Sequence, residues 1–201
     1  MKKKLVTFIT MVSVVFTTSY VAPVTAQAAK TKAWYKAYTK QISKIYSSGV
    51  SDEFGVDLMG SYLYLNNDNV PELYIVSSDN YQYLLSYSKG KLKVHKWFGI
   101  TDDIGLKYRK KKNYFEIDLG SPNGMNDSNE IKKLKDDGSC KDLGFSATYS
   151  DGSSECKWGE KKVSKKTFKS KERKLLKGAK AIFGLRSMTE LKADILEIAQ
   201  R

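Results

Sequence analysis

The pattern of apolar positions predicts a helix over residues 31–47. Large apolar side chains recur there at spacings of four, four and three residues, which places them on one helix face. Gly49 follows, and glycine is common just past a helix end because it adopts the left-handed backbone that closes the last turn. We expect these apolar residues to pack in the core: Trp34, Tyr38, Ile42 and Ile45.

Between residues 60 and 158 the pattern changes to short runs rich in Tyr, Leu, Val and Ile, which is typical of strands. Tight-turn pairs such as Lys89-Gly90 separate several of these runs. Because short connections favour neighbouring antiparallel strands, we expect one twisted antiparallel meander of about nine short strands. The expected strands are residues 62–65, 72–78, 81–88, 91–98, two within 105–120, 130–135, 143–150 and 153–158, with a loop at 121–129.

Two helices are expected after the strands. Ser164 is a good N-cap, and apolar positions at helical spacing continue to Phe183, so this helix should end at Gly184. Ser187 and Glu190 form a capping box that begins a final helix with apolar positions at Leu191, Ile195 and Ile198. The expected fold class is α+β: an N-terminal helix, an antiparallel β-meander of about nine short strands, and two C-terminal helices.

The first residues have the order of a secretory signal peptide. Three lysines precede an apolar run, and small residues follow it. We expect cleavage after Ala28, which divides the chain into a signal peptide (1–28) and a single secreted α+β domain (29–201). A retained N-terminal membrane anchor is the alternative. Nothing later in the chain approaches the roughly 18 apolar residues of a membrane span, so no transmembrane segment is expected in the mature chain.

Charge is unevenly distributed along the chain. Removing the leader's three lysines takes the formal net charge from +13 to +10. Residues 45–88 contain acidic residues but no Lys or Arg, whereas residues 157–180 hold eleven Lys or Arg against Glu160 and Glu172. A strongly basic region favours acidic partners. We expect a cell-envelope polyanion, or another extracellular component, in preference to nucleic acid; the alternative is an ordinary solvated face.

Two segments are candidate polyanion-binding surfaces. The helix expected after Ser164 carries basic residues at spacings of three, four, four and three, which form one stripe. The hairpin within 105–120 adds basic residues interleaved with tyrosines; a lysine-rich edge strand is the alternative interpretation of this hairpin. The candidates are Lys166, Lys169, Arg173, Lys177 and Lys180 on the helix, and Lys107, Arg109 and Lys111 on the hairpin.

The run NNDNVPE, residues 66–72, resembles a degenerate calcium loop. Calcium loops place carboxylate and amide oxygens at alternate positions so that they converge on one hard cation. Asn66, Asp68 and Glu72 occupy such positions, although Tyr64 replaces the first aspartate. The alternative is a polar Asx turn between two strands. Calcium is therefore a candidate cofactor, and otherwise none is expected.

Two cysteines are present, Cys140 and Cys156. In an exported chain an even pair predicts a disulfide. A catalytic thiol is the alternative. With only one histidine in the chain, two cysteines do not complete a structural zinc site.

Several motifs occur in an order that resembles a group of known proteins. They are YLYLNNDNVPELYIV, LLSYSKGKLK, IKKLKDDGSC and KWGEKKVSKKTFKSKERKLL. In this order they resemble uncharacterised small secreted or lipid-anchored proteins of Gram-positive anaerobes, which carry a D-x-D-G-D-G-x-P-E-L-type loop. The loop is degenerate here, and the resemblance covers roughly residues 31 to 185. It implies a fold and an extracellular location, but no activity.

These observations predict a secreted, non-enzymatic binding module that acts at or near the cell envelope. The alternative is a secreted, ribonuclease-like hydrolase. It would use His95 as the acid and Glu116 as the base, with Lys107 or Arg109 on the phosphate. No nucleophile triad or phosphate-binding glycine loop can be singled out, so no catalytic residue is assigned.

Overall fold

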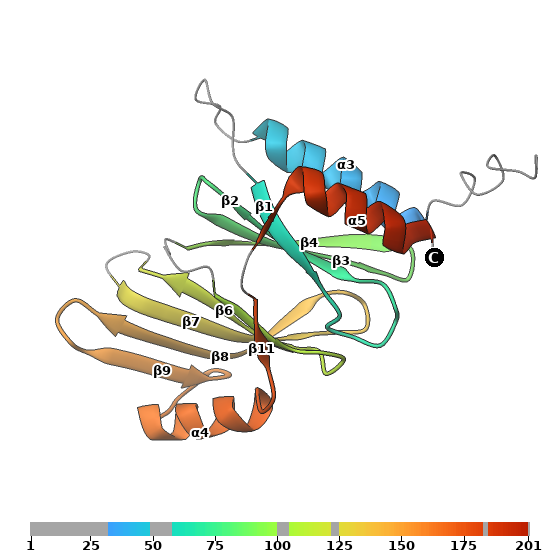
Figure 1. The fold of residues 1–201 in the computed structure, drawn as a ribbon. Helices are drawn as coiled ribbons and strands as arrows, with labels where there is room; N and C mark the ends of the chain where they lie inside the picture. Colours follow the sequence, from blue (N-terminus) through green and yellow to red (C-terminus); the bar gives the residue numbers. More distant parts are fainter. Residues whose placement is uncertain (1–31, 49–57, 100–104, 122–124, 183–184, 201) are drawn as a thin grey trace, which may run out of the picture.

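The computed structural model describes residues 32–48, 58–99, 105–121, 125–182 and 185–200 (Figure 1). The predicted signal peptide, residues 1–28, lies outside the described residues. Three helices occur in the described part: α3 (Ala33–Ser48), α4 (Lys165–Leu175) and α5 (Met188–Gln200). The predicted N-terminal helix is thereby confirmed, with bounds shifted by one or two residues.

Twelve strands lie in the described residues and form two antiparallel sheets. The first sheet has the order β12-β1-β2-β3-β4, and the second has the order β10-β9-β8-β7-β6-β5-β11. Their bounds are β1 (Leu58–Leu63), β2 (Glu72–Ser77), β3 (Tyr81–Ser88), β4 (Lys91–Phe98), β5 (Leu106–Arg109), β6 (Tyr114–Gly120), β7 (Met125–Leu134), β8 (Cys140–Tyr149), β9 (Ser154–Trp158), β10 (Lys161–Lys162), β11 (Lys180–Ala181) and β12 (Arg186–Ser187).

The predicted α+β class is confirmed, but the single meander is wrong. The chain makes one meander through β1–β4 and a second through β5–β10. The segment after α4 then returns, because β11 pairs with β5 in the second sheet and β12 pairs with β1 in the first. The three strands missing from the prediction, β10, β11 and β12, are two residues long, too short to show a periodic pattern.

Figure 1 shows the layers: α3 and α5 cover one face of the first sheet, the second sheet lies against its other face, and α4 covers the outer face of the second sheet. The side chains that the strands bury account for this order. On β2, Leu73 and Ile75 face α3 and α5, whereas Tyr74 faces the second sheet. The helix layer contributes the predicted positions Trp34, Tyr38, Ile42 and Ile45, together with Leu191 of α5. Between the sheets, residues such as Leu84 of the first pack against Phe115 and Ile117 of the second. A third, smaller cluster holds α4 on the outer face of the second sheet.

The helix predicted to run to Gly184 ends at Leu175 instead. Ser164 is the N-cap as predicted, since its hydroxyl accepts a hydrogen bond from the Thr167 N–H. After α4 the apolar residue Ile182 enters the core between the sheets, and its N–H donates to the Leu106 carbonyl at 2.9 Å. The backbone of Ile182 thus continues the hydrogen bonding of β11 to β5, although its spacing from the preceding apolar residues predicts a helix. Phe183 and Gly184 lie outside the described residues.

The other boundaries differ in smaller ways. The strand expected at 130–135 begins at Met125, so most of the predicted loop is strand. The strand expected at 62–65 is β1, which begins at Leu58. The capping box is confirmed, because the Ser187 N–H donates to Glu190 at 3.0 Å.

Candidate functional site

The outer face of the second sheet presents two rows of side chains. In an antiparallel sheet, residues directly opposite one another project from the same face. Tyr114 lies opposite Lys133, which lies opposite Lys141, so these three form one row across β6, β7 and β8. The neighbouring row crosses five strands and contains Lys107, Glu116, Ile131, Gly144 and Trp158.

Helix α4 lies across the second row. Phe168 is 1% exposed and packs edge-to-face on Trp158, with ring centroids 5.8 Å apart. Gly144 permits this contact, because a Cβ there would lie 3.0 Å from carbon atoms of both rings. Close approach of the helix thus depends on glycine at this strand position.

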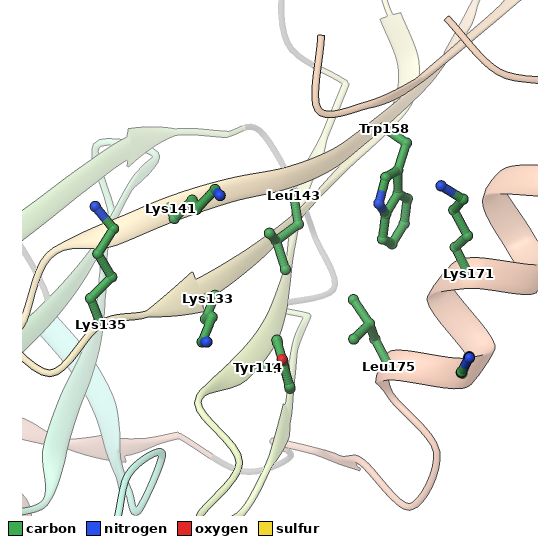
Figure 2. A pocket seen from close by; sticks show the side chains of 9 residues that line it. Tyr114, Lys133, Lys135, Lys141, Leu143, Trp158, Lys171 and Leu175 are labelled. Atoms are coloured by element: carbon green, nitrogen blue, oxygen red, sulfur yellow. The ribbon is translucent and has the colours of Figure 1, made fainter. Parts of the chain in front are cut away.

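The first row and the end of α4 enclose a pocket of about 640 Å³ (Figure 2). Its lining consists of an apolar and aromatic floor with a basic rim; we name it the lysine pocket. The floor residues are Tyr114, Leu143, Trp158 and Leu175, and the rim residues are Lys133, Lys135, Lys141, Lys171 and Lys174. Its volume is within the range of ligand sites in proteins, roughly 300 to 1,000 Å³.

A β-bulge helps to build the floor. Ile131 lies opposite Gly144 but Lys132 lies opposite Asp142, so Leu143 is an extra residue on β8. A bulge re-aims a side chain relative to the regular alternation of a strand. Here Leu143 points into the pocket beside Tyr114 (Figure 2).

No salt bridge among the described residues involves any of the five rim lysines. The acidic residues next to them in sequence are engaged elsewhere: Asp142 pairs with Lys132, and Glu172 pairs with Lys169. Lys133 and Lys141 are also directly opposite one another, an arrangement that destabilises a sheet. The pocket therefore concentrates positive charge that the described part of the chain does not neutralise.

Two rim lysines rest against rings of the floor. The Lys171 ammonium lies 5.1 Å from the Trp158 ring centroid, and the Lys133 ammonium lies 5.7 Å from that of Tyr114. These are cation–π distances. These two contacts place the ammonium groups of Lys171 and Lys133 next to the apolar surface of the lining.

Arg109 fixes the end of α4 that closes the pocket. Its guanidinium donates to the Leu175 carbonyl at 2.9 Å, which satisfies one of the free carbonyls at the helix C-terminus. In the same region Lys107 pairs with Glu116 at 3.2 Å. Glu116 is 4% exposed, and its burial raises the pKa of the carboxyl while Lys107 opposes that rise.

The five basic residues predicted to form one helical stripe do not all lie on α4, which corrects that part of the sequence-based prediction. Lys166, Lys169 and Arg173 lie on α4, but Lys177 and Lys180 lie beyond its end, so the five-residue stripe does not exist. On the hairpin, Lys107 and Arg109 form the contacts just described, and Lys111 lies in the turn with a positive φ of 58°. None of the eight predicted polyanion-binding residues lines the lysine pocket.

The pocket lysines were missed although the sequence contained a signal for them. In IKKLK the buried Leu134 alternates with Lys133 and Lys135, which places both lysines on one strand face. On α4, Lys171 is three residues after Phe168 and four before Leu175, so it shares the packed face. Lys166, Lys169 and Arg173 of the predicted basic stripe lie on the opposite side of this helix.

The structure brings the three candidate calcium residues together, but through a direct hydrogen-bond network. The Asn66 amide NH₂ donates to Asp68 Oδ2 and to Glu72 Oε1, both at 2.9 Å. The Leu65 N–H donates to the other oxygen of Glu72 at 2.8 Å. Burial raises the pKa of Glu72 to about 8. In the described residues no group of three or more His, Cys, Asp or Glu side chains is placed to hold a metal.

His95 and Glu116 do not form a catalytic pair. On β6, Phe115 faces the core between the sheets, so Glu116 projects from the outer face of the second sheet. His95 stacks with Trp97, which contacts Phe115, so the histidine lies on the inner side. The second sheet separates the two. His95 Nε2 lies 2.9 Å from the Gly138 carbonyl, and burial lowers the pKa of the ring.

The predicted disulfide is not formed, and both cysteines are free thiols. Cys156 lies opposite Ser146, whereas Cys140 is at the start of the same strand β8. At about 3.3 Å per residue the two lie roughly 20 Å apart, far beyond the Cα separation of a disulfide. Cys140 contacts the core between the sheets and Cys156 contacts α4, so they also face different layers. Burial raises the pKa of the Cys140 thiol to about 12.

Comparison of this chain with models of protein families, with curated proteins and with solved structures found no match. The resemblance based on motif order therefore stays a prediction. Within the described residues, none of the helices has both the length and the apolar character needed to cross a bilayer.

Proposed function

We propose that this chain is a secreted binding module that acts at or near the cell envelope and holds a polyanion in the lysine pocket. The observation that supports this most directly is the rim of five lysines without a carboxylate partner in the described structure. Ammonium groups on one side of a pocket attract a ligand that carries several negative charges.

The proposal changes the residues expected to bind but keeps the class of partner. The rim lysines come from β7, from the turn and strand that follow it, and from α4. Because these elements pack together, the backbone positions that carry the lysines are fixed relative to one another. Signal-peptide cleavage would deliver this surface to the envelope, where N-terminal sequencing of the exported protein should begin near Ala29.

The test is binding to inorganic polyphosphate as a function of salt. Replacing Lys133, Lys141 and Lys174 with glutamine should weaken binding at least tenfold, taking about 0.5 to 1 kcal/mol for each charge. The slope of log affinity against log salt should also become shallower, since fewer counterions are released. Circular dichroism checks that the variant is folded.

A matched control removes the same charge elsewhere. Lys36, Lys40 and Lys44 are exposed on α3, which packs on the first sheet, and they do not line the pocket. Their replacement by glutamine should leave affinity within about twofold, because distant exposed charges are largely screened by salt. Equal losses in the two triple variants would show that net charge alone drives binding and would contradict a pocket site.

The stripe predicted from sequence supplies a second comparison. Lys166, Lys169 and Arg173 still lie on α4, on the side away from the pocket lining. A glutamine variant of these three should bind polyphosphate nearly as well as the parent protein. If it loses more affinity than the pocket variant, the ligand follows the exposed helix face instead.

A further inference from the structure

We propose that the polyanion held in the lysine pocket is an anionic glycan, a polymer of sugar rings that carry acidic groups. This inference rests on the proposed function and adds the sugar ring as a recognised element. The observation behind it is the floor: two aromatic rings and two leucines lie beneath the rim lysines (Figure 2). A polymer of charges alone would leave this apolar surface without a contact.

The floor is built to a fixed shape. Trp158 lies opposite Gly144, and neither Phe168 nor Trp158 leaves room for a Cβ at that glycine. Leu143 reaches the pocket through a β-bulge. A rigid apolar surface of this kind suits a ring-shaped ligand, because such a ring loses little conformational entropy on contact.

The rings of the floor already attract positive groups. Lys171 lies against Trp158 and Lys133 lies against Tyr114 at cation–π distances. The face of an aromatic ring is negative, and the C–H hydrogens on the face of a sugar are weakly positive. Lys171 is exposed, so its ammonium can move to an acidic group of the ligand while a sugar ring takes its place on the indole.

The lysines stand on two sides of this floor. Lys133, Lys135 and Lys141 belong to β7, β8 and the turn between them, whereas Lys171 and Lys174 belong to α4. Acidic groups on both sides of a sugar chain would each meet an ammonium. The lining contains no arginine, the residue that adds cation–π contacts at single-stranded nucleic-acid sites. This favours sugars over the flat bases of single-stranded nucleic acid.

The experiment compares three probes by calorimetry: oligogalacturonate, inorganic polyphosphate of matched charge, and oligo(dT). We expect the parent protein to bind oligogalacturonate most tightly. Tyr114→Leu should weaken oligogalacturonate binding roughly threefold to tenfold, the value of one aromatic contact, and should leave polyphosphate binding unchanged. Tyr114→Phe keeps the ring and should retain full affinity.

A spectroscopic measurement on the parent protein does not depend on how these variants fold. Oligogalacturonate should shift the tryptophan emission and protect it from acrylamide, whereas polyphosphate should not. Trp158→Phe should abolish the shift, which assigns it among the three tryptophans.

The outcomes separate this inference from the proposed function. Equal binding of oligogalacturonate and polyphosphate, with no effect of Tyr114→Leu, overturns the glycan inference but leaves a polyanion site. Tighter binding of oligo(dT) that Tyr114→Leu weakens assigns the pocket to nucleic acid and also overturns it. Failure of the parent protein to bind any probe refutes both proposals.

Discussion

Replacing Glu72 with glutamine should remove most of the pH dependence that the 66–72 loop gives to folding stability. Glu72 is 2% exposed, and burial raises the pKa of its carboxyl from 4.5 to about 8. The folded protein therefore binds a proton that the unfolded chain releases between these two values. A carboxyl with a raised pKa stabilises the fold only at low pH, and this contribution is lost as pH rises through 8.

The size of the effect follows from the two pKa values. A tenfold difference in ionisation constant corresponds to about 1.4 kcal/mol, so full ionisation of Glu72 costs roughly 5 kcal/mol. Between pH 5 and pH 9 we expect the parent protein to lose roughly 2 to 4 kcal/mol through this group, the lower figure allowing for water that enters beside the carboxylate. The variant stays uncharged. It should start about 1 kcal/mol less stable at pH 5, because its amide does not accept hydrogen bonds at both atoms.

The assay is urea unfolding at pH 5, 7 and 9, followed by circular dichroism. Groups that titrate equally in both proteins cancel in the difference between their unfolding free energies. That difference should move in favour of Glu72→Gln as pH rises and should change sign. Glu160→Gln, at an exposed position, is the control and should show no such trend. A difference that is flat from pH 5 to pH 9 would refute the reasoning about burial.

Three further predictions concern the loop, α4 and the thiols. EDTA should leave the melting temperature unchanged, because the Asn66 amide already bridges the two carboxylates; a clear decrease would favour bound calcium. Phe168→Ala should lower the free energy of unfolding by about 3 to 5 kcal/mol in urea titrations, and an unchanged midpoint would contradict the packing of α4. Both Cys140 and Cys156 should react with a thiol reagent after unfolding without reductant; a disulfide in the mass spectrum would contradict this.

Some elements follow directly from local pattern. The strands expected at 81–88 and 91–98 match β3 and β4 residue for residue, because the Lys89-Gly90 turn marks both ends clearly. The four apolar positions of α3 are all buried, since a helix on a sheet hides one periodic face. Phe115 and Ile117, two residues apart on the strand expected within 105–120, are likewise buried on one face of β6.

The division into two sheets has no comparable local signal. β4 and β5 are consecutive strands that do not pair, and nothing in their own residues marks the break. Nor does spacing distinguish the apolar residues of a helix from those of the segment that follows it: Ile182, just after β11, fits the helical spacing but lies in the core between the sheets. The break between the two sheets and the position of Ile182 both depend on which strands pair with each other. The paired residues lie far apart in the sequence.

The composition of the candidate site also depends on how segments far apart in the sequence pair with each other. The basic character of the region after residue 157 is evident from composition. Which lysines share a pocket depends on the register of β7 with β8 and on the bulge at Leu143. Neither can be read from a charge run, so the sequence does not reveal which lysines share the pocket.

The pairing of β12 with β1 has a consequence for biosynthesis. β1 is among the earliest strands to be made, yet its outer edge is completed by Arg186 and Ser187, near the end of the chain. Leu191 of α5 then closes the core over that sheet. Until these residues emerge from the ribosome, the first sheet has an open edge and lacks part of the helix layer that covers its core.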